Sequence, residues 1–272
     1  MELVVFLVSL FGFLALGIPI AIVLVLCSMV LMYYGGMWDS MFVMIIPQSM
    51  LDGANNYPLM AIPFFVFAGE IMTEGGLSKR VVKLAQLIIG RVRGGLGYAA
   101  IVSSVIFAGL MGSSVGEAAA LGSLLLPMMA QAGYKPGRAG GVIASGAILG
   151  PIIPPSITLI VYASITNVSV SQLFMGSVIP GILLAGSLIV YALVYGKRKN
   201  LPAHEKQTPK QIGHAFKEGI WALLMPIIIL GGIFGGIFTP TEAAAVAVVY
   251  ALIISLTVYR DMKLSELPQV FE

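Results

Sequence analysis

The sequence predicts an all-α polytopic membrane protein, and its composition and the length of its apolar runs carry that prediction. Hydrophobic residues make up 58% of the 272 residues, charged residues make up 10%, and the mean hydropathy is +0.99. Soluble domains carry roughly 25% charged residues, so the composition excludes that class. The apolar runs are long enough to cross a bilayer as helices. The net charge of +3 does not indicate nucleic-acid binding, because the basic residues follow the membrane topology.

The amino-terminal part, residues 1–76, is expected to form scaffold helices. Residues 3–34 are apolar throughout, and as one helix they would extend roughly 48 Å, well beyond the ~30 Å hydrocarbon core. Gly17 and Pro19 divide this run into two short helices. The expected elements are two short helices, an interfacial segment and a third span, at 2–16, 19–34, 35–56 and 57–74.

An amphipathic helix along the membrane surface is expected over residues 77–93. Apolar residues recur there at helical spacing, and basic residues surround them. The apolar positions are Val81, Val82, Leu84, Leu87 and Ile88, and the basic ones are Lys79, Arg80, Lys83, Arg91 and Arg93.

Residues 94–176 are expected to form one region that begins with a re-entrant hairpin over 94–134. The centre of that hairpin reads GLMGSSVGE, and its apolar arms are about 15 residues each, which is short for a full span. Two short full spans are the alternative. Gly112, Ser113 and Ser114 would form the tip of the hairpin.

A broken helix is expected over 136–165, because residues 146–156 read GAILGPIIPPS. Its prolines remove amide donors and free the carbonyls one turn earlier, around 146–150. Irregular backbone persists inside a bilayer where it lines a wet cavity or binds a ligand. Carbonyl and hydroxyl oxygens are ligands that suit Na⁺, and the half-helix starting near Val115 would present its positive end to an anion. Plain helix packing is the alternative explanation for such prolines.

The rest of the chain completes a one-sided charge pattern. A closing helix is expected at 177–196, a cytoplasmic linker at 197–214 and two helices within 215–272, at 216–237 and 240–259. With the amino terminus outside and the hairpin re-entrant, all 15 Lys and Arg residues fall on the cytoplasmic side. The outer segments carry only acids, which are Glu2, Asp39 and Asp52.

The chain also contains an internal repeat. Aligning Pro19 with Pro240 superposes a Gly-rich helix end, a proline, an Ala/Val-rich helix and a closing Tyr, in 11–34 and 232–259. In the expected topology the two copies run in opposite directions. Inverted repeats with broken helices are typical of secondary transporters.

Five motifs occur in a fixed order: GSSVGEAAALGSLLLPMM, GY, GPIIPPS, SVSQLFMGSVIPG and GIFTPTEAAA. In this order they resemble the large membrane subunit of the tripartite ATP-independent periplasmic (TRAP) transporters, the DctM-like permeases. The resemblance implies an elevator-type, Na⁺-coupled importer of carboxylates in the bacterial inner membrane. It also implies a small TRAP membrane subunit and a soluble periplasmic binding protein as partners. By motif, the first Na⁺ site would comprise Gly112, Ser113, Ser114, Gly150, Pro154, Pro155 and Ser156.

The resemblance also sets a limit, because family members are longer and contain two complete repeats. This chain ends two helices into the second repeat, so a fragment, a truncated gene or one piece of a split permease is expected. A non-transporting scaffold or an inactive permease fragment is therefore the alternative function. An intramembrane serine enzyme is disfavoured, because neither His lies in a predicted span to serve as its base.

Four further glutamates lie outside the seven site residues. The sequence assigns no role to Glu117, which lies just behind the hairpin tip. Glu242 is expected to cap a helix, since it follows Thr239 at capping-box spacing. Glu70 and Glu74 are expected to face the basic pair Lys79 and Arg80 as interfacial acids.

Overall fold

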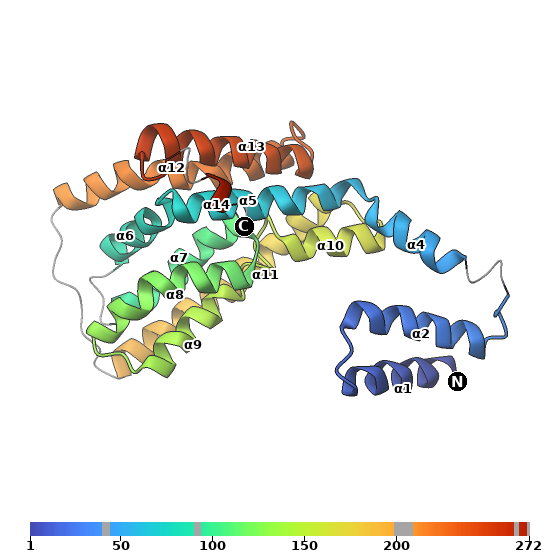
Figure 1. Ribbon diagram of the computed structural model, residues 1–272. Coiled ribbons are helices and arrows are strands. Elements are labelled where there is room, and N and C mark those ends of the chain that lie inside the picture. The colour runs from blue at the N-terminus through green and yellow to red at the C-terminus, as the bar shows by residue number, and fades with distance from the viewer. Residues whose placement is uncertain (40–43, 90–93, 199–208, 264–266, 271–272) are drawn as a thin grey trace. The chain divides into compact units, whose positions relative to one another are not determined.

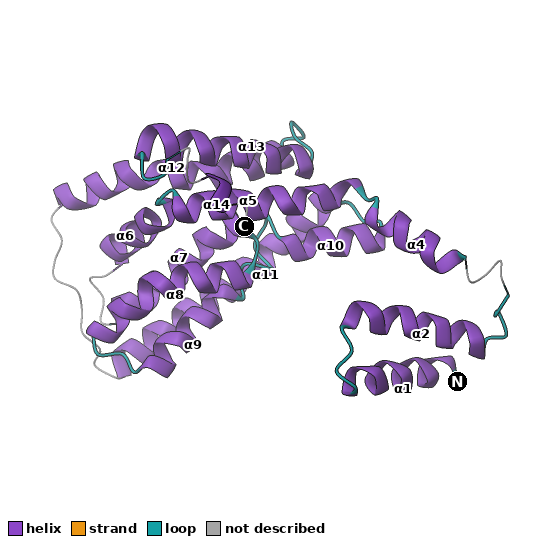
Figure 2. Ribbon diagram, in the orientation of Figure 1, coloured by secondary structure: helices purple, strands orange, loops and turns teal. Residues whose placement is uncertain are grey.

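A computed structural model describes residues 1–39, 44–89, 94–198, 209–263 and 267–270 of the chain. Within these ranges the regular structure is entirely helical, with no strand (Figure 2). The predicted all-α class is therefore confirmed. The chain divides into two compact units, Met1–Asn56 and Tyr57–Glu272, and each is described by itself.

The first unit is built around a helical hairpin (Figure 1). Its elements are α1 (Glu2–Ala15), α2 (Ile20–Tyr34) and α4 (Ile45–Ala54). Gly17 lies between α1 and α2 in the left-handed region, with φ 76°, where a residue without a Cβ meets no steric penalty. Cys27 is fully buried in this unit and is a free thiol.

The second unit contains the remaining helices and the hydrophobic core. They are α5 (Ala61–Glu74), α6 (Leu77–Ile89), α7 (Gly95–Met111), α8 (Ser114–Gln131), α9 (Pro136–Ala147), α10 (Ile157–Thr166), α11 (Val170–Arg198), α12 (Pro209–Phe234), α13 (Pro240–Ile253) and α14 (Leu267–Val270). Short turns of 3₁₀ and π-helix, Tyr57–Met60 and Ile254–Tyr259, extend α5 and α13. In the core α5 packs on α13, α6 packs on α12 and α7, and α7 also contacts α8, α9 and α11.

Among the described residues, three helical segments are long and apolar enough to cross a bilayer, namely Val170–Gly196, Gly213–Phe234 and Pro240–Tyr259. The bent pair Tyr57–Glu74 and Leu77–Leu87 would be a fourth. The most apolar 18-residue stretch of α11 has only 17% of its residues buried inside the protein. In water such a surface would be costly, whereas lipid matches it. The chain is therefore a multi-pass membrane protein.

Helix α6 buries its apolar face against protein. Leu77, Val81 and Leu84 are 0–2% exposed, and they face the neighbours α7 and α12. The helix turns 68° away from α5 at Gly75–Gly76. The expected amphipathic helix is thus present, although 90–93 lie outside the described residues, and its place along the membrane surface stays a prediction.

Two helices begin earlier than the hydropathy pattern predicts. α11 starts at Val170, where the Ser169 hydroxyl accepts a hydrogen bond from the Gln172 amide at 3.5 Å. α12 starts at Pro209, inside the expected linker 197–214, and its first turn is polar. Helix formation depends on backbone bonds and capping, so a polar first turn is helical without adding to hydropathy. Residues 199–208 of the linker lie outside the described residues.

The turns inside the two halves of the repeat share one local geometry. The Ile18 amide donates to the Phe13 carbonyl at 3.4 Å, and the Ile237 amide donates to the Gly232 carbonyl at 2.9 Å. Each bond spans five residues across a left-handed glycine, as in a Schellman turn. This pairing matches Gly17 with Gly236, so the second loop is longer than the alignment on proline implies. The inverted relation of the two halves stays a prediction, because they lie in separate units.

The charge pattern makes a topology prediction that labelling can check. On a background in which the single cysteine, Cys27, is replaced by alanine, Asp39→Cys should react with a membrane-impermeant maleimide from the periplasm. Lys135→Cys should react only after the membrane is permeabilised. Both positions are exposed to solvent. The opposite labelling pattern would invert the topology and contradict the positive-inside assignment.

Candidate functional site

The hairpin tip is built by one glycine and one serine. α7 ends at Met111, and Gly112 reverses the chain in the left-handed region with φ 61°. Ser113 then caps α8, its hydroxyl accepting a hydrogen bond from the Gly116 amide at 3.4 Å. The two arms have 17 and 18 residues, which is short of the roughly 20 residues of a full span.

The helix break lies between α9 and α10. α9 ends at Ala147, and α10 begins only at Ile157. Ser156 caps α10, since its hydroxyl accepts from the Leu159 amide at 3.3 Å. The same hydroxyl donates to the Pro151 carbonyl at 2.7 Å. One serine thus ties the break to the new helix.

The expectation of free carbonyls across 146–150 is only partly right. Tight turns satisfy three of them, because the Gly146, Ala147 and Leu149 oxygens accept amide bonds at 2.9, 3.2 and 2.8 Å. Around Pro151 the chain compensates for the missing donor by shorter hydrogen-bonded turns, such as the bond from the Ile152 amide to the Leu149 carbonyl. Within the described part of the chain, no donor bonds the two carbonyls that remain in this range, Ile148 and Gly150, or the carbonyls of Pro154 and Pro155 outside it.

The two broken segments lie in direct contact. The Ile157 amide donates to the Gly112 carbonyl at 3.2 Å, which joins α10 to the hairpin tip. A Cβ placed on Gly112 would lie 2.5 Å from the Pro155 oxygen. A Cβ placed on Gly150 would lie 3.1 Å from the Ser113 carbonyl carbon and 3.2 Å from the Ser114 nitrogen. Both glycines are therefore required for this close approach.

The seven predicted site residues gather around this contact. Gly112, Gly150, Pro154, Pro155 and Ser156 are buried, while Ser113 and Ser114 are half-buried beside exposed Val115. Pro154 lies slightly apart, because its oxygen is 3.8 Å from the Cβ position of Gly109, within α7. The arrangement places uncharged backbone and hydroxyl oxygens, together with the starts of α8 and α10, in one region.

Glu117 is the residue whose place the sequence did not predict. It is fully buried, and neither carboxyl oxygen has a hydrogen-bond partner among the described residues. One of these oxygens lies 3.0 Å from the Cβ position of Gly150. The hydroxyl of Ser104, on α7, is likewise buried without a partner. In the sequence, an acidic residue within an otherwise apolar half-helix is the feature that could have identified this position as functional.

The donor set fits a hard cation. No described group of three His, Cys, Asp or Glu side chains is placed to hold a metal ion, so these residues offer no nitrogen–sulfur site of the kind that Zn²⁺ prefers. Carbonyl and hydroxyl oxygens with one nearby carboxyl are the ligands of hard cations. The Gly150 and Pro155 carbonyls, which have no donor among the described residues and belong to residues at the contact, supply that chemistry.

The predictions for the other acidic residues have different outcomes. Glu242 caps α13 as predicted: the Thr239 amide donates to its carboxylate at 2.8 Å, and the Thr239 hydroxyl accepts from the Glu242 amide at 3.3 Å. Glu70 and Glu74 were expected to face Lys79 and Arg80, and for Arg80 the structure shows a different acidic partner. Arg80 pairs with Asp261 and lies 3.8 Å above the Tyr259 ring, because the bend at Gly75–Gly76 directs α6 toward the end of α13.

Comparison with known proteins places the sequence in a family. Residues 7–272 match the sequence model described as "Tripartite ATP-independent periplasmic transporter, DctM component". The chain is 46% identical over 267 residues, 98% of its length, to the 2,3-diketo-L-gulonate TRAP transporter large permease protein YiaN of Escherichia coli. It is 43% identical over 92% of its length to the C4-dicarboxylate TRAP transporter large permease protein DctM of Vibrio cholerae.

A third relative, the sialic acid TRAP transporter large permease protein SiaM of Vibrio cholerae, is 36% identical over 94% of the chain. The matched regions cover 62%, 55% and 60% of these three relatives. The chain therefore spans about three fifths of the length of the relatives it matches.

Proposed function

The chain belongs to the DctM family of TRAP transporter large permeases, and from this membership we propose that it forms part of a Na⁺-coupled importer of organic acids. The family consists of transport subunits rather than enzymes. The proposed location is the bacterial inner membrane. The proposed partners are a small TRAP membrane subunit and a periplasmic binding protein that delivers the substrate.

The contact between the hairpin tip and the helix break carries this proposal. A backbone hydrogen bond of 3.2 Å joins the Ile157 amide to the Gly112 carbonyl. Two serine-capped helices, α8 and α10, start on either side of it. In a bilayer, broken backbone of this kind is tolerated where it binds an ion or lines a cavity. Na⁺ would be held by oxygens of Gly112–Ser114 and Gly150–Ser156, and it would neutralise the freed carbonyl dipoles.

The substrate class follows from the relatives' names and from the local electrostatics. The three relatives carry diketogulonate, C4-dicarboxylate and sialic acid, which are all carboxylates. Helix N-termini attract anions, and α8 and α10 both begin at the contact. We therefore propose that a carboxylate approaches these two helix ends after Na⁺ has bound.

Uptake by a chimera tests the proposal. Residues 1–272 would replace the matching 62% of the Escherichia coli relative, with that transporter's own small subunit and binding protein. The chimera should take up 2,3-diketo-L-gulonate in a Na⁺-dependent manner. Robust expression with no uptake under any Na⁺ gradient would favour the alternative, a membrane scaffold or an inactive permease fragment.

Two serine variants locate the ion. Ser113→Ala or Ser114→Ala should raise the Na⁺ concentration for half-maximal uptake about ten- to hundred-fold, because losing one ligand of a multi-oxygen site costs ~1–3 kcal/mol. Ser123→Ala is the matched control, since that hydroxyl lies farther along α8 and bonds only to the Ala120 carbonyl. Unchanged Na⁺ dependence in both tip variants would place the ion elsewhere.

A binding measurement needs only the 272 residues themselves. Na⁺, and not K⁺, should raise the melting temperature of the 272-residue chain in detergent. Ligand binding to the folded state stabilises it by about 2.7 kcal/mol at 100 times Kd. The same serine variants should reduce this shift, and the Ser123 variant should not.

A further inference from the structure

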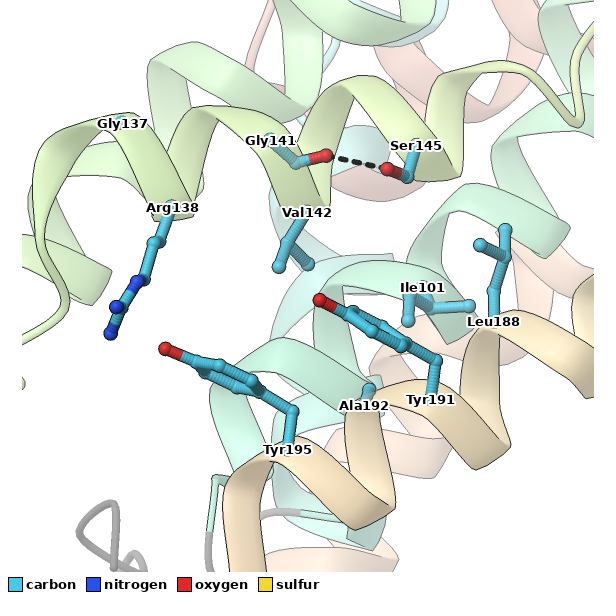
Figure 3. Close-up of a pocket in the computed structure, with 10 residues that line it drawn as sticks. All are labelled: Ile101, Gly137, Arg138, Gly141, Val142, Ser145, Leu188, Tyr191, Ala192 and Tyr195. Atoms are coloured by element: carbon cyan, nitrogen blue, oxygen red, sulfur yellow. Dashed lines mark hydrogen bonds between the residues drawn. The ribbon is translucent and has the colours of Figure 1, made fainter. Parts of the chain in front are cut away.

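A groove with one polar end lies between α9 and α11, over α7 (Figure 3). Its volume is about 300 Å³. Its floor is formed by Ile101, and its α9 wall is low because Gly137 and Gly141 lack side chains. The groove begins near the start of α9, whereas the helix break follows the end of α9. At 1.5 Å per residue these two places are roughly 15 Å apart. The groove extends along α9 as far as Ser145, so it is its polar end, at Arg138, that is separate from the ion site proposed above.

The polar end of the groove carries an unpaired cation and an unpaired hydroxyl. Arg138 lies with its guanidinium carbon 5.4 Å from the centre of the Tyr195 ring. Among the described residues Arg138 has no acidic partner. The Tyr195 hydroxyl is buried and has no hydrogen-bond partner in that part of the chain. Figure 3 shows the guanidinium and this hydroxyl at the same end of the groove.

The rest of the groove is apolar. Val142, Leu188 and the Tyr191 ring line it. The Tyr191 ring is stacked on Tyr195, with ring centres 6.2 Å apart and planes 19° from parallel. The single serine on its wall, Ser145, donates its hydroxyl to the Gly141 carbonyl at 2.7 Å and is not available as a donor to a ligand.

We propose that this groove binds a phospholipid of the cytoplasmic leaflet. The phosphate would accept hydrogen bonds from Arg138 and Tyr195, and an acyl chain would lie along Val142 and Leu188. Arg recognises phosphate by charge-assisted hydrogen bonds, and basic pockets between membrane helices on the cytoplasmic side bind anionic head groups. A buried hydroxyl without a partner is costly, and the phosphate would supply the missing acceptor.

The placement of basic residues near the groove supports a lipid of the cytoplasmic leaflet. Lys135 and Arg138 belong to the start of α9, and Lys197 and Arg198 belong to the end of α11. In the expected topology these helix ends are cytoplasmic. A soluble anion would use the polar end and leave the apolar trough empty. A phospholipid fits both parts, because it joins a phosphate to a hydrocarbon chain.

Native mass spectrometry of the detergent-purified 272-residue chain tests the proposal. The chain should retain phosphatidylglycerol in preference to diacylglycerol, which has the same chains and no phosphate. Arg138→Gln should lower this retention at least tenfold, and Tyr195→Phe should lower it about three- to tenfold. Lys135→Gln is the matched control, because it removes a charge at the same membrane face from a residue that does not line the groove.

A second pair of variants tests the trough. Gly141→Leu should fill the groove and expel the lipid, and Gly140→Leu, which does not line it, should leave lipid retention unchanged. A Cβ at either glycine meets no atom within 4 Å, so both variants should fold. Three results would each overturn the proposal: equal retention by all variants, competition by inorganic phosphate as strong as by lipid, or a dimer that only Gly141→Leu dissociates.

Discussion

Replacing Gly112 by alanine should abolish Na⁺-dependent uptake by the chimera. The new Cβ would lie 2.5 Å from the Pro155 oxygen and 3.1 Å from the Ile157 nitrogen, both backbone atoms that cannot rotate away. The left-handed backbone, with φ 61°, adds roughly 1–2 kcal/mol for any residue with a Cβ. The tip would have to move away from α10, and displacing two or three oxygen ligands would weaken Na⁺ binding about 100-fold or more.

Gly116→Ala is the control for this variant. Its Cβ would lie 3.8 Å from the Ser113 hydroxyl, an ordinary contact, and the residue is inside α8. Uptake and the Na⁺-induced rise in melting temperature should stay near the parent values. If Gly112→Ala retains the parent Na⁺ dependence, the contact between tip and break is not the ion site.

Replacing Glu117 by glutamine should raise the Na⁺ concentration needed for half-maximal uptake about 100-fold. The carboxyl is fully buried without a hydrogen-bond partner in the described chain, and it lies against Gly150. A buried charge requires compensation, and a Na⁺ ion held beside Gly150 would supply it. Over about 6 Å at an effective dielectric constant of 20, one unit charge contributes roughly 3 kcal/mol.

Titrating uptake against Na⁺ measures this effect at constant substrate. Glu242→Gln is the control, since that carboxylate is exposed and caps α13. A Glu117→Gln chimera with unchanged Na⁺ affinity would show that the carboxyl is neutral in the protein and serves packing beside Ser104. Reduced expression alone would not explain a change in half-maximal Na⁺ concentration, because that quantity is independent of the amount of protein.

The broken elements were predictable from sequence because their causes are local. A proline lacks an amide donor, and a glycine can adopt the left-handed conformation. The residues of GPIIPPS and Gly112 therefore predict a helix break and a chain reversal at their own positions. The capping of α13 by Glu242 is local for the same reason. The contact of the two breaks followed from the family resemblance, since no spacing rule joins residues 112 and 157.

The errors come from tertiary structure. The polar first turn of α12 lies inside the expected linker, because hydropathy does not register a polar helical turn. The first turn of α11 lies against the protein core, since Val170 and Phe174 are buried, and that burial depends on tertiary packing. Arg80 was assigned to nearby acids, yet the 68° bend of α6 brings it to Asp261. Glu117 could be noted as unusual, but its burial against Gly150 depends on how α8 packs against the end of α9.

The hydrogen bond from the Ile157 amide to the Gly112 carbonyl restricts how the two breaks move. That amide belongs to the first turn of α10, and its acceptor lies at the hairpin tip. The hydrogen bond therefore holds the start of α10 to the tip. If the hairpin tip moved away alone, this hydrogen bond would break, and the Ile157 amide and the Gly112 carbonyl would face an apolar surrounding. Displacement of hairpin and broken helix together, as one rigid body, preserves the hydrogen bond.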